Sequence, residues 1–151
     1  MDKAALKKAY FTAALVSAAI TMAIFFYAVV GEALLRMGFK PVLQPPASYA
    51  AKYLLYFIGL STLLLVKLAG ARLAQKQPTP AAAIKALTTG SIVTAALCEL
   101  PGIAALILLL LTGFYPDFYL LLAFSAALEA YHFPRLSRWE ERLRGEGYYE
   151  R

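Results

Sequence analysis

Long apolar runs separated by short polar segments form the main pattern of the chain. Four runs stand out, at about Tyr10 to Leu35, Tyr53 to Ala71, Leu87 to Leu111 and Phe118 to Phe133. A helix needs about 20 apolar residues to cross the hydrocarbon core of a bilayer, and the fourth run is near the lower limit. The pattern predicts an all-α, polytopic membrane protein whose four transmembrane helices form two helical hairpins.

Polar segments rich in glycine and proline separate the runs and predict loops. The residues that carry these signals are Gly38, Pro41, Pro45, Pro46, Lys76, Gln77, Pro78, Pro80, Gly113 and Pro116. We expect a transmembrane domain over residues 1–134 and a cytoplasmic interfacial tail over residues 135–151. In the tail, Leu136, Trp139 and Leu143 share one face, which predicts a short amphipathic helix lying at the membrane interface. A solvated tail without fixed structure is the alternative.

The amino-acid composition supports the membrane assignment. The 151 residues are 61% hydrophobic and 16% charged, whereas about 25% of the residues in a soluble domain are charged. The net charge is +6, and the lysines and arginines cluster at the ends of apolar runs, where they suit anionic lipid headgroups. No basic face for a nucleic acid is visible, so the expected partner is the lipid bilayer and not a nucleic acid.

The distribution of lysine and arginine predicts the orientation of the helices. Twelve of the 15 lysines and arginines fall in the N-terminal arm, the second connection and the tail. Because cytoplasmic segments are enriched in these residues, both termini should be cytoplasmic, in a prokaryotic plasma (inner) membrane. The apolar stretch from Tyr10 to Val30 is longer than the core of a typical signal peptide, so we expect it to be retained as the first helix.

The residues needed for enzyme chemistry are scarce. Cys98 is the single cysteine and His132 the single histidine, so an internal disulfide is excluded and no metal-ligand spacing is present. The sequence also lacks a nucleophile–base pair and a glycine-rich phosphate loop. We therefore expect no enzyme activity, no cofactor and no metal site.

Glu99 is the most informative residue, because it lies near the middle of the third run. An ionised carboxylate at that depth is costly, and such residues usually face the interior of a bundle or a water-filled cavity. Desolvation favours the neutral acid, so we expect Glu99 to be buried and protonated at neutral pH, as a proton- or ion-binding site. A neutral glutamate that only fixes helix packing is the alternative.

Other polar groups could take part in such a site. Pro101 has no N–H to donate to the carbonyl of Leu97, which could form an ion cage with Glu99, although an ordinary proline kink is the plainer interpretation. Glu129 and His132, three residues apart near the cytoplasmic end of the fourth run, are expected to form a solvated pair at the membrane interface, with a route by which a proton enters as the alternative.

Small residues on two helices predict close helix packing. They are Ser91, Ala95 and Gly102, which share a helical face with Glu99, and Ala14 and Ala18 on the first helix. We expect these faces to join copies of the chain in a homo-oligomer. A faint repeat, with six identities between residues 8–22 and 85–99, favours duplication of a hairpin, with chance in an alanine-rich stretch as the alternative.

Residues 76–110 resemble the c subunit, or proteolipid, of rotary ATP synthases. The motifs that carry the resemblance are Lys76-Gln77-Pro78, Ile84-Lys85, Ala96-Leu97-Cys98-Glu99 and Gly102-Ile103 before a leucine and isoleucine run. In that family an Arg-Gln-Pro turn is cytoplasmic and a mid-membrane carboxylate carries the ion. The resemblance implies a ring of hairpins with Glu99 as that carboxylate. The family's glycine-rich inner helix is missing, because the preceding run contains only Gly59 and Gly70.

The sequence thus favours a non-enzymatic integral membrane protein that forms a homo-oligomer, ring-like by the resemblance, with Glu99 as a proton- or ion-sensitive residue. Two alternatives use the same residues differently. Glu99 could line a small ion channel or transporter, which predicts a hydrated path from both sides of the membrane. The chain could instead be a structural subunit of a larger complex, with other membrane subunits as partners.

Overall fold

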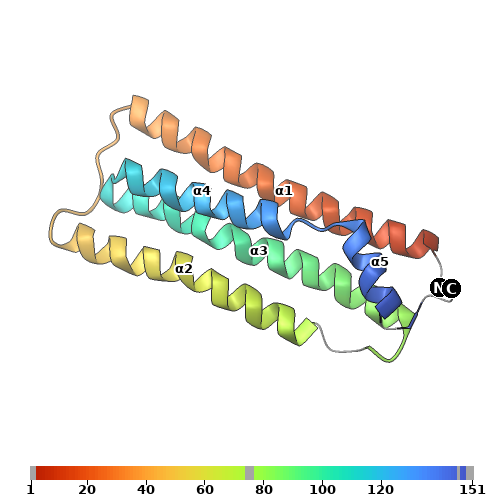
Figure 1. The fold of residues 1–151 in the computed structure, drawn as a ribbon. Coiled ribbons are helices and arrows are strands. Elements are labelled where there is room, and N and C mark those ends of the chain that lie inside the picture. Colours follow the sequence, from red (N-terminus) through yellow and green to blue (C-terminus); the bar gives the residue numbers. More distant parts are fainter. Residues whose placement is uncertain (1–2, 74–76, 146, 149–151) are drawn as a thin grey trace.

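The computed structural model describes residues 3–73, 77–145 and 147–148, and every regular element in this part of the chain is a helix (Figure 1). The helices are α1 (Lys3–Arg36), α2 (Ala47–Leu73), α3 (Pro80–Thr112), α4 (Tyr115–His132) and α5 (Leu136–Gly145). Of these, α1, α2 and α3 are long and apolar enough to cross a membrane, which confirms an all-α architecture suited to a bilayer. α4 has 18 residues and is not among the three.

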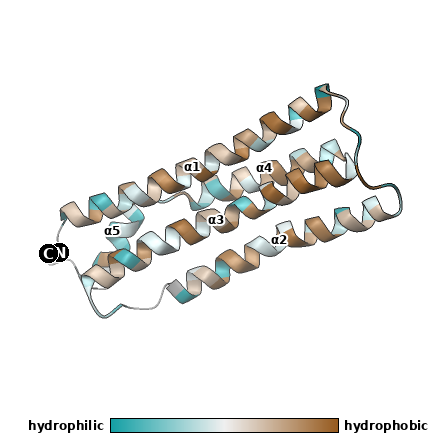
Figure 2. Cartoon of the chain, turned by 180° about the vertical axis from the view of Figure 1, so that it is seen from behind, coloured by the Kyte–Doolittle hydropathy of each residue, from teal (hydrophilic) through white to brown (hydrophobic). Residues whose placement is uncertain are grey.

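The helices extend beyond the apolar runs of the sequence. α1 begins at Lys3 rather than near Tyr10, and α3 begins at Pro80 rather than near Leu87. With 34 and 33 residues they are each about 50 Å long, whereas the hydrocarbon core of a bilayer is about 30 Å thick. Their ends therefore reach the headgroup region. Figure 2 shows hydrophobic stretches along these helices and a largely hydrophilic α5.

Local signals in the sequence define both ends of α3. Thr79 is the N-cap, and its side chain accepts a hydrogen bond from the N–H of Ala82 at 3.2 Å. At the other end Gly113 has a φ of 67°, and its N–H donates to the carbonyl of Leu109. Because glycine adopts this left-handed conformation without strain, α3 ends there and α4 follows after a tight turn.

The loop after α1 closes the same end of the bundle. The N–H groups of Val42 and Leu43 donate to the carbonyls of Leu110 and Leu111, at 3.4 and 2.8 Å. These carbonyls belong to the last turn of α3, where no donor is available within the helix. The loop therefore satisfies backbone groups that lipid cannot satisfy.

α3 is the central helix of the fold. It packs along α1, α2 and α4, whereas α1 and α2 hardly touch each other. α1 and α3 run in one direction and α2 and α4 in the other, so α1 begins at the end of the bundle where α5 lies (Figure 1). We call this end the terminal end, and the opposite end, with the loop after α1, the loop end.

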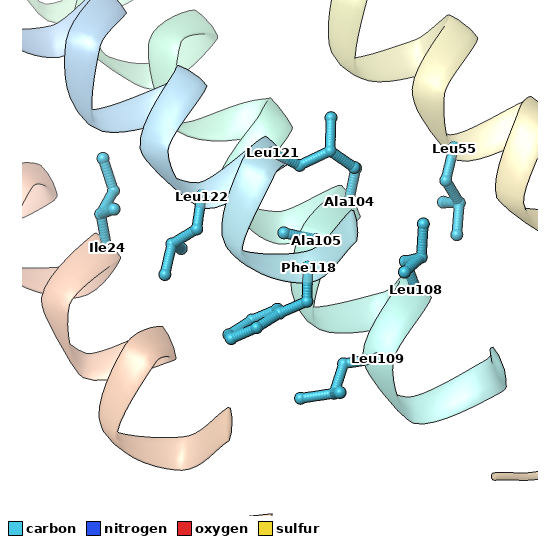
Figure 3. Close-up of a cluster of buried hydrophobic side chains, with 9 residues drawn as sticks. All are labelled: Ile24, Leu55, Ala104, Ala105, Leu108, Leu109, Phe118, Leu121 and Leu122. Carbon is cyan, nitrogen blue, oxygen red and sulfur yellow. The ribbon is translucent and has the colours of Figure 1, made fainter. Parts of the chain in front are cut away.

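An apolar cluster fills the half of the bundle nearer the loop end (Figure 3). Its buried members come from α1 to α4 and are Ile24, Leu55, Ala104, Ala105, Leu108, Leu109, Phe118, Leu121 and Leu122. The fully buried ring of Phe118 lies over Gly31, where a Cβ atom would be 2.6 Å from it. The missing side chain at Gly31 therefore lets α1 approach α4.

An ion pair joins α2 to α4 at the loop end. Nζ of Lys52 lies 2.8 Å from Oδ1 of Asp117, and the hydroxyl of Tyr56 donates to the same oxygen at 2.8 Å. On α1, Oε2 of Glu32 lies 3.9 Å from Nε of Arg36. Two of the basic residues at this end thus have acidic partners.

α5 packs onto the bundle. Trp139 and Leu143 are buried against Leu6, Ala13 and Ala83 of α1 and α3. The amphipathic helix expected in the tail is present, but protein and not lipid covers its apolar face. The expectation that it lies on the membrane interface through that face is wrong, because the ends of α1 and α3 supply an apolar surface that the sequence pattern did not reveal.

Candidate functional site

Polar side chains gather near the middle of the bundle, on the terminal side of the apolar cluster. They come from α1, α3 and α4, and we call them the polar cluster: Tyr27, Cys98, Glu99, Ser125, Glu129 and His132. Two of them, Glu99 and Glu129, are carboxylates, and the sequence assigned them separate roles.

Glu99 accepts a hydrogen bond from α1. The hydroxyl of Tyr27 donates to Oε1 of Glu99 at 2.5 Å. Gly102, almost one turn after Glu99, permits this close packing, because a Cβ atom there would lie 3.5 Å from the Tyr27 ring and 3.1 Å from Oγ of Ser125. Glu99 is half-buried, whereas the sequence predicted a buried residue. The expectation failed because depth in a bilayer does not determine burial within the protein.

Glu129 is the deeply buried carboxylate. It is 1% exposed, and neither of its oxygens has a hydrogen-bond partner in the described part of the chain. It interacts electrostatically with Glu99 of the neighbouring helix α3. A solvated pair with His132 at the end of a span is therefore contradicted. Glu129 is buried because it shares the inward face of α4 with Phe118 and Ser125.

His132 ends α4 beside Cys98. Its Nδ1 atom lies 3.0 Å from the carbonyl oxygen of Leu128 and 3.9 Å from Sγ of Cys98. Cys98 is fully buried and interacts electrostatically with Glu129. His132 is half-buried and lines a pocket at the terminal end. The imidazole is thus close both to this pocket and to the interior of the polar cluster.

Ser125 binds a backbone carbonyl of α3, one residue after the Leu97 carbonyl that the sequence indicated. Its hydroxyl donates to the carbonyl of Cys98 at 2.6 Å, whereas Pro101 removes the helical donor of the Leu97 carbonyl. α3 continues through Pro101 as one helix. No hydrogen bond links Glu99 to Leu97 in the described residues, so the cage formed by these two residues stays a prediction.

The small-residue faces pack helices of one chain. Ala95 is 3% exposed and Gly102 is buried against α1 and α4, while Ser91, Ala14 and Ala18 are half-buried. We expected these faces to join copies of the chain. The interior positions of Ala95 and Gly102 contradict such a contact, because small residues allow close approach equally within a chain and between chains.

The two ends of the bundle differ in their access to the polar cluster. At the terminal end, a pocket of about 240 Å³ is lined by His132 and by Ser91 and Thr94 of α3. Toward the loop end, the apolar cluster fills the space between the helices (Figure 3). The pocket therefore reaches the polar cluster at His132, from the terminal end.

Tyr27 and Ser125 belong to the site but were missed from the sequence. Tyr27 lies three residues after Ile24 and four before Gly31, both buried, so it shares the inward face of α1. Ser125 lies seven residues after the buried Phe118 on α4. Helical spacing places both residues on inward faces. It did not single them out, because a lone tyrosine or serine in an apolar run is common.

The resemblance to proteolipids stays a prediction. Its turn motif begins at Lys76, which lies outside the described residues, and Arg151 of the basic tail also lies outside them. Comparisons of the chain with protein-family models, with curated proteins and with solved structures found no match.

Proposed function

We propose that the chain is a non-enzymatic integral membrane protein with four membrane-spanning helices, whose two carboxyl groups at Glu99 and Glu129 bind a proton taken up from the cytoplasm. The observation that carries the proposal is the burial of Glu129, which interacts electrostatically with Glu99, in a bundle whose three longest helices suit a bilayer. We call these two residues the carboxyl pair.

α4 is the fourth span in this proposal. Its 18 residues give a length of about 27 Å, close to the roughly 30 Å of a hydrocarbon core. It packs along α3 and contacts α1, and Asp117 near its start pairs with Lys52 of α2. α4 thus lies beside two helices that are long and apolar enough to span the bilayer.

The terminal end faces the cytoplasm in this proposal. It belongs to the side that holds twelve of the 15 lysines and arginines of the sequence, as cytoplasmic segments typically do. At the loop end, Lys52 pairs with Asp117 and Arg36 with Glu32. The orientation follows from the count of basic residues, because the loop end holds only Arg36, Lys40 and Lys52.

Two carboxyl groups that interact electrostatically inside the bundle favour sharing a proton. Ionising both would place like charges together where water screens them poorly, so one group stays neutral. The hydroxyl of Tyr27 donates to Glu99, so one oxygen of that carboxyl group has a hydrogen-bond partner. Glu129 has no such donor among the described residues, so it is the better holder of the proton.

The surroundings of the carboxyl pair support uptake from one side. His132 lines the pocket at the terminal end and lies about one helical turn from Glu129. The apolar cluster separates the pair from the loop end. An ion channel requires a polar path to both sides, so this arrangement favours one-sided proton binding over free conduction.

Reaction with dicyclohexylcarbodiimide tests for the proton, because this hydrophobic reagent modifies neutral carboxyl groups in membranes. The intact protein in lipid nanodiscs should gain one adduct by mass spectrometry, at a rate that falls as pH rises. Glu129→Gln should abolish the adduct. Glu32→Gln, which changes a half-exposed carboxylate at the loop end, is the matched control and should leave the adduct unchanged.

Two outcomes would contradict the proposal. If no pH yields an adduct on Glu99 or Glu129, the pair holds no reactive proton and serves packing, which favours a structural subunit. Proteoliposomes that contain a pH-sensitive dye provide the second check. We expect a proton flux no higher than in protein-free vesicles, and a flux that Glu99→Gln abolishes would favour the channel or transporter instead.

A further inference from the structure

A pocket of about 240 Å³ lies at the terminal end, where α4 stops and α5 begins. α4 ends at His132, and the chain leaves its axis at Pro134, so α3 has no α4 neighbour along its first turns. Gly70 of α2 and Gly90 of α3 line the space and contribute no side chain. The pocket therefore results from a short fourth helix combined with small residues on two longer ones.

The pocket is lined by basic and hydroxyl groups. Arg138 and Arg142 are four residues apart on one side of α5, Arg135 directly precedes this helix, and all three line the pocket. Ser91 and Thr94 of α3 add hydroxyl groups, and none of the residues that line the pocket is acidic. Guanidinium groups in this arrangement bind phosphate or carboxylate oxygens with paired hydrogen bonds.

Two of the three arginines are exposed. Arg135 and Arg138 are exposed, whereas Arg142 is half-buried and has a further interaction of its own. Trp139, which follows Arg138 in the sequence, is buried and anchors α5 against the bundle. The backbone that carries the two exposed arginines is thus held against α1 and α3.

The size and position of the pocket indicate which anion it takes. Sites that enclose a whole small molecule usually measure about 300–1,000 Å³, so a volume of about 240 Å³ suits a ligand that inserts only one end. Leu63 and Leu64 of α2 are 49% and 60% exposed and lie up to two turns before Gly70, where apolar chains can pack. Basic pockets between spanning helices at headgroup level are typical binding sites for anionic lipid headgroups.

We propose that this pocket, the arginine pocket, binds the phosphate headgroup of an anionic phospholipid in the leaflet at the terminal end. The arginines contact the phosphate oxygens, the hydroxyl groups of Ser91 and Thr94 complete the polar wall, and the acyl chains lie along the apolar surface of α2. This proposal does not depend on proton binding by the carboxyl pair, although His132 borders both sites.

Trp139 provides a direct readout, because it is the single tryptophan of the chain and lines the pocket. The full chain is reconstituted in phosphatidylcholine nanodiscs that contain a small fraction of lipid with a nitroxide quencher high on one acyl chain. The labelled lipid is either phosphatidylglycerol or phosphatidylcholine. Labelled phosphatidylglycerol should quench the fluorescence of Trp139 several times more strongly than labelled phosphatidylcholine.

A double variant tests the arginines. An arginine near a lipid surface contributes about a fivefold preference for anionic lipid, so Arg135→Gln with Arg138→Gln should weaken the apparent affinity roughly 25-fold. The matched control, Lys7→Gln with Arg72→Gln, removes the same charge from exposed positions outside the pocket and should leave the affinity within about twofold. Protection of the buried Cys98 from alkylation confirms that each variant is folded.

The remaining outcomes are distinct. Equal quenching by the two lipids, or an equal loss of preference in the control variant, would overturn the proposal of an anion site in the pocket. Inorganic phosphate added to the nanodiscs should not displace labelled phosphatidylglycerol. Displacement by phosphate would identify a soluble anion as the ligand and overturn the assignment to lipid.

Discussion

Replacing Gly31 with alanine should destabilise the bundle, although alanine normally favours a helix. A Cβ atom at Gly31 would lie 2.6 Å from Cε1 and Cζ of Phe118 and 3.3 Å from Cδ2 of Leu109. Phe118 is fully buried, and its ring also contacts that of Tyr119 with 4.8 Å between the centroids. The ring is rigid and has no free space beside it, so α1 or α4 must move to accept the methyl group.

The size of the effect follows from two opposing contributions. Alanine is more favourable than glycine inside a helix by about 0.5–1 kcal/mol, whereas an extra methyl group in a packed core costs about 1–3 kcal/mol. We therefore expect Gly31→Ala to lower the free energy of unfolding by about 1–2 kcal/mol. Gly70→Ala is the control, because no neighbouring atom lies within 4 Å of the place that a Cβ atom would take there, and it should stabilise the protein by about 0.5–1 kcal/mol.

Cys98 supplies the assay, since it is the single cysteine and is fully buried. Alkylation of Cys98 in detergent reports how often the bundle opens, and a loss of 1–2 kcal/mol should raise its rate about 5–30-fold. Phe118→Leu combined with Gly31→Ala should recover part of the loss, so that the two changes are not additive. An unchanged or slower rate in Gly31→Ala would refute the argument that the ring of Phe118 is fixed.

Three further predictions concern other contacts. Trp139→Ala should release α5 locally, at a cost of about 3–5 kcal/mol, and raise hydrogen exchange in α5 while α2 stays protected. Replacing Lys52 and Asp117 singly and together by apolar residues should show a coupling of about 1 kcal/mol in unfolding experiments, and zero coupling would argue against the pair. An impermeant thiol reagent should label Lys40→Cys, but not Gly145→Cys, in intact cells.

The positions of the helices could be predicted well from the sequence, because apolar runs bounded by proline and glycine leave few alternatives. Pro80 and Gly113 were the local signals for the ends of α3. The helix in the tail was also visible, from the spacing of Leu136, Trp139 and Leu143. Whether lipid or protein covers the apolar face of this helix could not be predicted, since the sequence pattern is the same in both cases.

The candidate site was predicted only in part. Glu99 could be selected because a charge in an apolar run is rare, but Glu129 lay near the end of a short run and was expected to be more solvated. Its burial depends on how α4 packs along α3, which periodicity within one helix does not specify. For the same reason, Ala95 and Gly102 were correctly associated with helix packing in general but assigned to a contact between copies, which their burial contradicts.

The central place of α3 has a consequence for biosynthesis. The ribosome completes α1 and α2 before α3, yet these two helices hardly touch each other in the finished protein. During translation they must therefore reside in the membrane as independent segments, with Ser17 and Thr62, both later buried, facing lipid or insertion machinery. α1 and α2 can dock only after α3 has been inserted. A nascent chain halted after residue 73 should therefore hold two inserted but undocked helices.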